Sequence, residues 1–115
     1  MPREYRLYLR DIIAAAAFIE KQTEGLTYDQ LVADEVRLNA VLHDLTVIGE
    51  AVKHIPGEVR QRAPDIPWAE IAGTRDVIVH GYFELDLPVL WHIVREEVSA
   101  LRQQIEALLK ELDKE

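Results

Sequence analysis

Residues 86–112, DLPVLWHIVREEVSALRQQIEALLKEL, decide the fold of this chain. Apolar side chains recur there at alternating spacings of four and three residues, the period of one buried helix face. Such a repeat favours long helices that pack at roughly 20° to one another, as in four-helix bundles. Asp86 is the expected N-cap, and Pro88 is tolerated in the first turn. The stripe consists of Leu87, Trp91, Val94, Val98, Leu101, Ile105, Leu108 and Leu112.

A similar pattern predicts a helix over residues 4–22 that stops near Gly25. We interpret the alanine run 14–17 as a place where another helix approaches closely. The predicted inner face consists of Tyr5, Leu9, Ile12, Ala16 and Ile19.

Thr27 begins the next helix, because Gln30 three residues later completes a capping-box pattern. We expect one long helix from there to the residue before Pro56, where the chain breaks. Its expected inner stripe is Leu31, Leu38, Val41, Leu45, Ile48, Val52 and Ile55.

Prolines and glycines punctuate the middle of the chain. A short helical piece through Val59 is expected, followed by a loop that Pro64 and Pro67 frame. A third main helix begins at Pro67 or Trp68 and ends at Gly81, where we expect a left-handed C-terminal residue. The predicted fold is all-α, an up-and-down bundle of four main helices plus this short piece.

Length and composition limit the number of domains and the kinds of site and segment that this chain can contain. The 115 residues fit a single domain, residues 1–115, and the absence of cysteine excludes disulfides, thiolate metal sites and a cysteine nucleophile. The N-terminus is charged where a signal peptide would be apolar, and no apolar run is long enough to cross a bilayer. We therefore expect a cytoplasmic protein with no membrane partner.

The formal net charge of −8 argues against a protein that coats nucleic acid nonspecifically, because the mean field repels polyanions. Basic residues nevertheless outnumber acidic ones between residues 53 and 75. If a polyanion binds, we expect it to bind there. The basic residues are Lys53, Arg60, Arg62 and Arg75, and the acids are Glu58, Asp65 and Glu70.

The stretch GTRDVIVHGYF at residues 73–83 mixes ionisable and apolar side chains in one expected helix. Buried charge is costly unless it is paired or used. Arg75 and His80 are five residues apart, so at about 100° per residue they project about 140° from each other. Two arrangements could bring them together: a frayed last turn that lets His80 swing, or a second copy of the helix across a two-fold axis.

Arginine and histidine together suffice for metal-independent RNA cleavage. A guanidinium can hold a phosphodiester and stabilise its growing charge, and an imidazole can take or return a proton. Attack by the ribose 2′-oxygen would leave a cyclic phosphate and spare DNA. The spacing alone does not decide between this chemistry and a structural Asp76–His80 pair with a half-buried Tyr82.

The segment from Arg75 to Tyr82 resembles the R-x4-H-x-Y signature of HEPN proteins of the HepT type, the toxin halves of HEPN/MNT toxin-antitoxin pairs. Further similar stretches follow in the expected order: IGEAVKHIP at 48–56, IPWAEIAGTRD at 66–76 and VHGYFELDLPVLWHIV at 79–94. The resemblance covers roughly residues 5–109.

This resemblance implies a HEPN fold that forms a homodimer with both motifs in one cleft. It also implies a ribonuclease toxin in which Arg75 and His80 are catalytic, acting on RNA without a cofactor. Tyr82 matches the tyrosine to which the cognate MNT nucleotidyltransferase antitoxin transfers AMP from ATP. Many relatives have asparagine where this chain has Asp76, which could support His80 or weaken RNA binding.

Other polar and aromatic residues have structural roles as their expected explanation. Glu50 could reach the cleft or pair with an arginine such as Arg37 or Arg75. Trp68 and Trp91 are expected to be core or interface anchors. No metal site is expected, because the remaining histidines are too scattered: His43, His54 and His92.

The alternative function is a noncatalytic helical dimer that binds a nucleotide or a nucleotidyltransferase partner. The acidic composition favours this alternative, because an enzyme acting on RNA would gain from a positive field.

Overall fold

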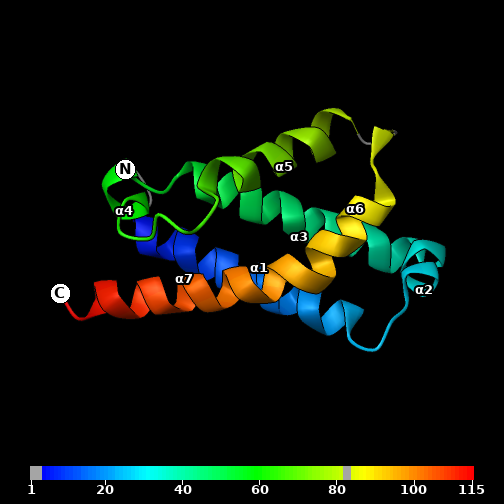
Figure 1. Cartoon of the computed structure of the whole chain (residues 1–115), viewed down its shortest axis with the longest axis horizontal. Coiled ribbons are helices and arrows are strands. Elements are labelled where there is room, and N and C mark those ends of the chain that lie inside the picture. The colour runs from blue at the N-terminus through cyan, green and yellow to red at the C-terminus, as the bar shows by residue number, and fades with distance from the viewer. Residues whose placement is uncertain (1–3, 82–83) are drawn as a thin grey trace.

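The computed structural model describes residues 4–81 and 84–115, and every element within them is helical. The long helices α1, α3, α5 and α7 run lengthwise with alternating chain direction, so the predicted all-α class is confirmed (Figure 1). The elements in chain order are α1 (Tyr5–Thr23), α2 (Tyr28–Ala33), α3 (Glu35–Lys53), α4 (Gly57–Arg60), α5 (Trp68–His80), α6 (Leu87–His92), a π-helical segment (Ile93–Glu97) and α7 (Val98–Asp113).

The first predicted helix is confirmed as α1. Its N-cap is Glu4, whose carboxylate accepts a hydrogen bond from the Arg6 amide at 3.1 Å, and Gly25 beyond its end has a φ of 74°. Ala15 and Ala16 are buried, and α1 packs against both α3 and α7. The small side chains therefore lie where other helices approach, as expected.

The predicted second helix is wrong in one respect, because it is divided at Asp34 into α2 and α3. The Thr27–Gln30 capping box is present, with contacts of 3.2 and 2.9 Å, but α2 ends at Ala33. Asp34 then caps α3 by accepting from the Arg37 amide at 3.1 Å. A short acidic side chain offers the backbone this alternative to helical hydrogen bonding, which stops one helix and starts the next.

The final helix begins as predicted, with the Asp86 carboxylate accepting from the Val89 amide at 3.1 Å. Its strict four-and-three stripe is interrupted by the π-helical segment, where the Val98 amide donates to the Ile93 carbonyl five residues earlier. The wider turn shifts the buried face, so Leu90 is buried before the segment. Leu87 and Trp91 are only partly buried. Beyond the segment the predicted residues of α7 are buried as expected.

The start of α5 is tied to the core by Trp68. Its side chain is buried, and its indole N–H donates to the Ala63 carbonyl at 3.1 Å. Arg60 in α4 donates to the carbonyls of Val52 and Ile55, at 2.6 and 3.0 Å, and so closes the end of α3. Trp68 is thus a core anchor, whereas Trp91 packs edge-on against Tyr28 with ring centroids 6.2 Å apart.

The end of α5 differs from expectation. Gly81 has a φ of −130°, not the left-handed value predicted for it. Its amide donates to the Val77 carbonyl at 2.8 Å, which continues the helical pattern by one bond. The last turn is therefore hydrogen-bonded rather than frayed, and no left-handed residue is needed to end it.

Of the described elements, α3 is the one against which α5 packs extensively. Figure 1 shows α5 beside α3 along the edge of the molecule away from α7. Between α5 and α7 lies a groove of about 350 Å³ whose lining includes Leu45, Ile48 and Ile71. No helix in the described ranges has the length and apolar character that a bilayer span requires.

Candidate active site

Arg75 lies at the crossing of α5 with α3. Its side chain is 28 % exposed, and Nε is 3.3 Å from Oε2 of Glu50. This Nε is buried and makes no hydrogen bond within the described residues, so its attraction to Glu50 is electrostatic. Nη1 donates to Oδ1 of Asp76 at 3.1 Å. Two carboxylates from two helices therefore hold one guanidinium.

Asp76 is shared between two cations. Lys53 of α3 donates to Oδ1 at 2.8 Å, and Arg75 donates to the same oxygen. The hydrogen bond from Lys53, followed by that from Arg75, lowers the pKa of Asp76 below its ordinary value. The structural alternative of an Asp76–His80 pair is not found among the described contacts, because the carboxylate turns toward α3 instead.

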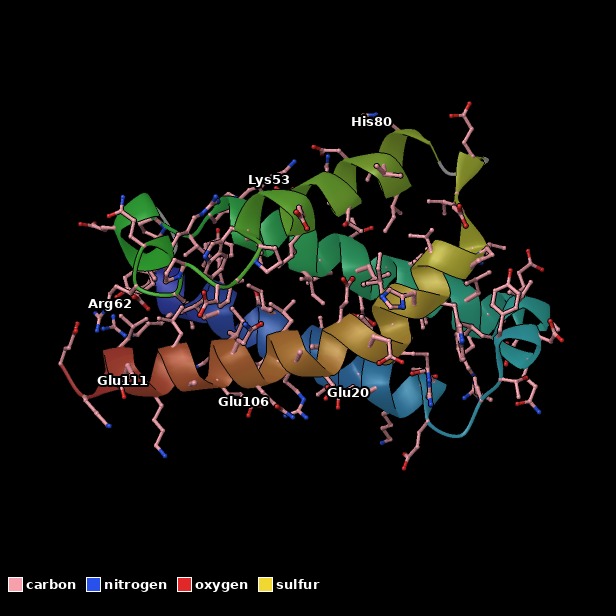
Figure 2. The ribbon with its side chains drawn as sticks, viewed as in Figure 1. Glu20, Lys53, Arg62, His80, Glu106 and Glu111 are labelled. Carbon is pink, nitrogen blue, oxygen red and sulfur yellow. The ribbon has the colours of Figure 1, made fainter. Side chains whose placement is uncertain are left out.

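His80 is the last residue of α5 and is exposed. Figure 2 shows it at the outer edge of α5, along the same side of the molecule as Lys53. Within the described residues it forms no recorded hydrogen bond or ion pair, and none joins it to Arg75. Because α5 remains helical through His80, one protomer does not bring the two predicted catalytic residues together.

Glu50 pairs with Arg75, one of the two arginines expected for it, whereas Arg37 pairs with Asp34 at 3.2 Å. The other Glu50 oxygen, Oε1, lies 3.5 Å from Nε2 of His54. Sequence reasoning missed this second partner, although the spacing of four residues on one helix was a usable signal.

His54 also contacts α1. Its imidazole stacks on the ring of Tyr8, with centroids 4.5 Å apart and planes 9° from parallel. The side chains Tyr8, His54, Glu50 and Arg75 therefore form a continuous row across α1, α3 and α5. We call these four side chains the Tyr8/His54/Glu50/Arg75 row.

Tyr82, predicted as the modified residue, lies outside the described residues. His43 and His92 are exposed. In residues 4–81 and 84–115, no three or more histidine, aspartate or glutamate side chains gather as ligands of a metal ion would.

The four basic residues between positions 53 and 75 have different partners. Lys53 and Arg75 lie at the motif, whereas Arg60 binds backbone carbonyls and Arg62 pairs with Glu115. Figure 2 shows His80 and Lys53 on one edge of the molecule and the acidic Glu20, Glu106 and Glu111 along α1 and α7 on the other. These three acids are themselves paired with cations, Glu20 and Glu106 with Arg102 and Glu111 with Lys114.

A family model described as "Ribonuclease HepT-like" matches residues 12–108. The chain is 38 % identical over 110 residues to a Thermococcus cleftensis protein named "Probable ribonuclease HepT", covering 96 % of this chain and all of that relative. It is 34 % identical over 105 residues to a "Putative RNase" of Caldanaerobacter subterraneus subsp. tengcongensis, covering 91 % of this chain and 94 % of that protein.

A Methanocaldococcus jannaschii protein named "Gamma-glutamylcyclotransferase and putative RNase" is 33 % identical over 114 residues. That alignment covers 99 % of this chain and 51 % of the relative, so the chain spans about half of that protein. No solved structure matches the chain. The HepT-type resemblance noted from the motif is confirmed by the family match and by the length of these alignments. The chain therefore belongs to the ribonuclease HepT-like family.

Proposed function

We propose that this protein is the toxin of a toxin-antitoxin pair and acts as a metal-independent endoribonuclease. The proposal rests on the contacts of Arg75 and the exposure of His80 in a chain of this family. Arg75 is held in place by Glu50 and Asp76, and His80 stands exposed at the end of the same helix. One cation is oriented and one imidazole is open to a substrate.

The proposed reaction divides between these two side chains. Arg75 binds the nonbridging oxygens of a phosphodiester and stabilises the charge that develops on them. His80 takes the proton from the 2′-hydroxyl as its oxygen attacks phosphorus. The bond from phosphorus to the 5′-oxygen breaks, that oxygen gains a proton, and a 2′,3′-cyclic phosphate remains. His80, protonated by that first transfer, returns the proton to the leaving 5′-oxygen.

The separation of Arg75 from His80 supports a homodimer, because a second copy of α5 can supply the missing partner. Val77 and Val79 are 57 % and 46 % exposed on α5, directly before His80. These two side chains project about 160° from each other at about 100° per residue, so a second subunit lying along α5 would cover one of them. Sedimentation of the purified protein tests this part of the proposal, with a mass near twice 13.2 kDa expected.

RNA cleavage by the purified protein tests the activity. Cleavage of a single-stranded RNA is expected to persist in excess chelator and to fall at least a hundredfold in Arg75→Ala and in His80→Ala. His92→Ala is the matched control, because His92 is an exposed histidine on α6, outside the motif, and should cut at the parental rate. Equal cleavage by all four proteins would identify a contaminating nuclease.

Neutralisation is proposed to occur by AMP transfer to Tyr82 from a partner nucleotidyltransferase. The tyrosine oxygen attacks the α-phosphorus of ATP, pyrophosphate leaves, and the phenolic proton is lost. An added phosphate that reached Arg75 would occupy the cation and repel RNA. Mass spectrometry after incubation with the partner and ATP should show added AMP in the parent and in Tyr28→Phe. It should show none in Tyr82→Phe.

A second candidate function is a noncatalytic dimer that binds a nucleotide or the nucleotidyltransferase. The contacts of Arg75 favour it, because two carboxylates already offset the charge that RNA would need. Expression in cells separates the candidates. A toxin arrests growth and His80→Ala relieves the arrest, whereas a binding module gives the same growth in both.

A further inference from the structure

We propose that His54 is a positioning residue for Arg75 and that it acts through Glu50. The inference deepens the proposed ribonuclease function and rests on it for its kinetic consequence. The contacts on which it depends are those of the Tyr8/His54/Glu50/Arg75 row, and they do not depend on any activity. Among the histidines of residues 4–81 and 84–115, His54 is the one that contacts Glu50 without belonging to the R-x4-H element.

Glu50 contacts a different residue with each of its oxygens. Oε2 lies 3.3 Å from Nε of Arg75, and Oε1 lies 3.5 Å from Nε2 of His54. The Glu50 side chain is 49 % exposed, so its neighbours leave it room to rotate. A long flexible side chain with one contact keeps much of its rotamer freedom. The second contact, to His54, restricts the carboxylate to the orientation that faces Arg75.

His54 can provide this restraint because its side chain, although 47 % exposed, stacks on an aromatic ring. The imidazole lies flat against Tyr8, a residue of the neighbouring helix α1. α1 is anchored in the core by fully buried residues such as Leu9 and Ile12. The orientation of the stacked ring is thereby tied to the bundle interior and passed to Glu50 through the Nε2 contact.

The guanidinium of Arg75 is planar, so its orientation matters for gripping a phosphate. Glu50 holds it at Nε, and Asp76 holds it at Nη1. If Glu50 turns away, the Nε side is released and the plane can rotate about the Asp76 contact. A misplaced guanidinium still attracts RNA but stabilises the transition state less well, so the loss falls on kcat rather than KM.

Kinetics of three variants test this role in the full-length protein. His54→Leu is expected to lower kcat about tenfold, as partners behind a directly acting group commonly do, while KM changes less than about threefold. His54→Gln keeps an N–H donor near the Nε2 position and should recover most of the rate. His92→Leu, the matched control, should behave like the parent.

A double-mutant cycle decides whether Glu50 carries the effect. In a Glu50→Gln background, adding His54→Leu should lower kcat no further, because residues that act in series are not additive. Equal tenfold losses in both backgrounds would overturn the proposal. So would a His54→Leu variant with the parental kcat.

A second readout separates this inference from the proposed function. The Nε–Hε resonance of Arg75 in a ¹⁵N–¹H spectrum reports its surroundings whether or not RNA is cut. It should move in His54→Leu and stay in place in His92→Leu. An inactive parent with a moved resonance refutes the ribonuclease proposal and upholds the positioning contact. An active parent whose Arg75 resonance stays unmoved in His54→Leu refutes the positioning role alone.

Discussion

Gly49 of α3 faces Arg75 of α5 so closely that a β-carbon on Gly49 would lie 2.4 Å from the Arg75 β-carbon. The same β-carbon would lie 3.1 Å from the carbonyl oxygen of Ile71. A glycine is therefore required where the two helices cross. The close approach also brings Glu50, the next residue, within reach of the guanidinium.

Replacing Gly49 by alanine should force α5 away from α3. Overpacking against backbone and a β-carbon is expected to cost about 1–3 kcal/mol of unfolding free energy. Because the Glu50–Arg75 contact spans the same crossing, RNA cleavage should fall at least tenfold. Urea denaturation and initial cleavage rates provide the two measurements.

Gly73 provides the matched control on α5. A β-carbon there would meet no atom within 4 Å, and Gly73 lies inside the helix. Gly73→Ala should therefore stabilise the protein by about 0.5–1 kcal/mol and leave cleavage intact. If both alanine variants behaved alike, the close crossing would not be what determines the site.

Asp76→Asn should strengthen RNA binding. The carboxylate accepts hydrogen bonds from Arg75 and Lys53. It therefore competes with phosphate for both cations and adds a negative charge. Removing the charge should lower KM several-fold at low salt, with a smaller effect at high salt as screening weakens the repulsion. An Asp76→Asn variant with raised KM would show that the carboxylate assists binding instead.

The pH dependence of stability follows from the lowered pKa of Asp76. A carboxylate with a depressed pKa in the folded state contributes stability that is present above its unfolded pKa, about 3.9, and is lost as pH falls through the folded pKa. The stability difference between the parent and Asp76→Asn should therefore be constant from pH 7 to about pH 5. It should shrink only below about pH 4. A change near neutrality in urea denaturation would contradict this assignment.

Asp34→Ala tests the break between α2 and α3. Losing the contact from the Asp34 carboxylate to the Arg37 amide should cost about 1 kcal/mol of unfolding free energy. Asp29→Ala removes an acidic residue from the first turn of α2 and should cost less than about 0.5 kcal/mol. Equal losses would mean that Asp34 is not the capping residue.

The predictable parts of the fold are those that local chemistry determines. Caps at Thr27 and Asp86 and the buried face of α1 follow from residue type and spacing. The break at Asp34 was missed because an aspartate within a periodic helix resembles a solvated surface residue. The π-helical segment was missed because Leu90 and Trp91 are both apolar, so the sequence does not reveal which of them faces the core.

The sequence predicted which residues form the candidate site better than it predicted which of them contact one another. Sequence reasoning named Glu50 and Arg75 as possible partners, and the structure pairs them. It missed His54, because the stacking of His54 on Tyr8 joins residues 46 positions apart and depends on how α1 and α3 pack. The predicted convergence of Arg75 with His80 does not occur within one chain, so it stays a prediction that rests on the proposed dimer.

Mixed dimers test the central claim, that Arg75 and His80 act across two subunits, most directly. Arg75→Ala and His80→Ala chains with different tags are co-expressed, and the dimer that carries both tags is purified. In this dimer one of two shared sites has both residues intact, so the account predicts about half of the parental rate per dimer although each variant alone is inactive. A mixed dimer as inactive as either variant would contradict the claim.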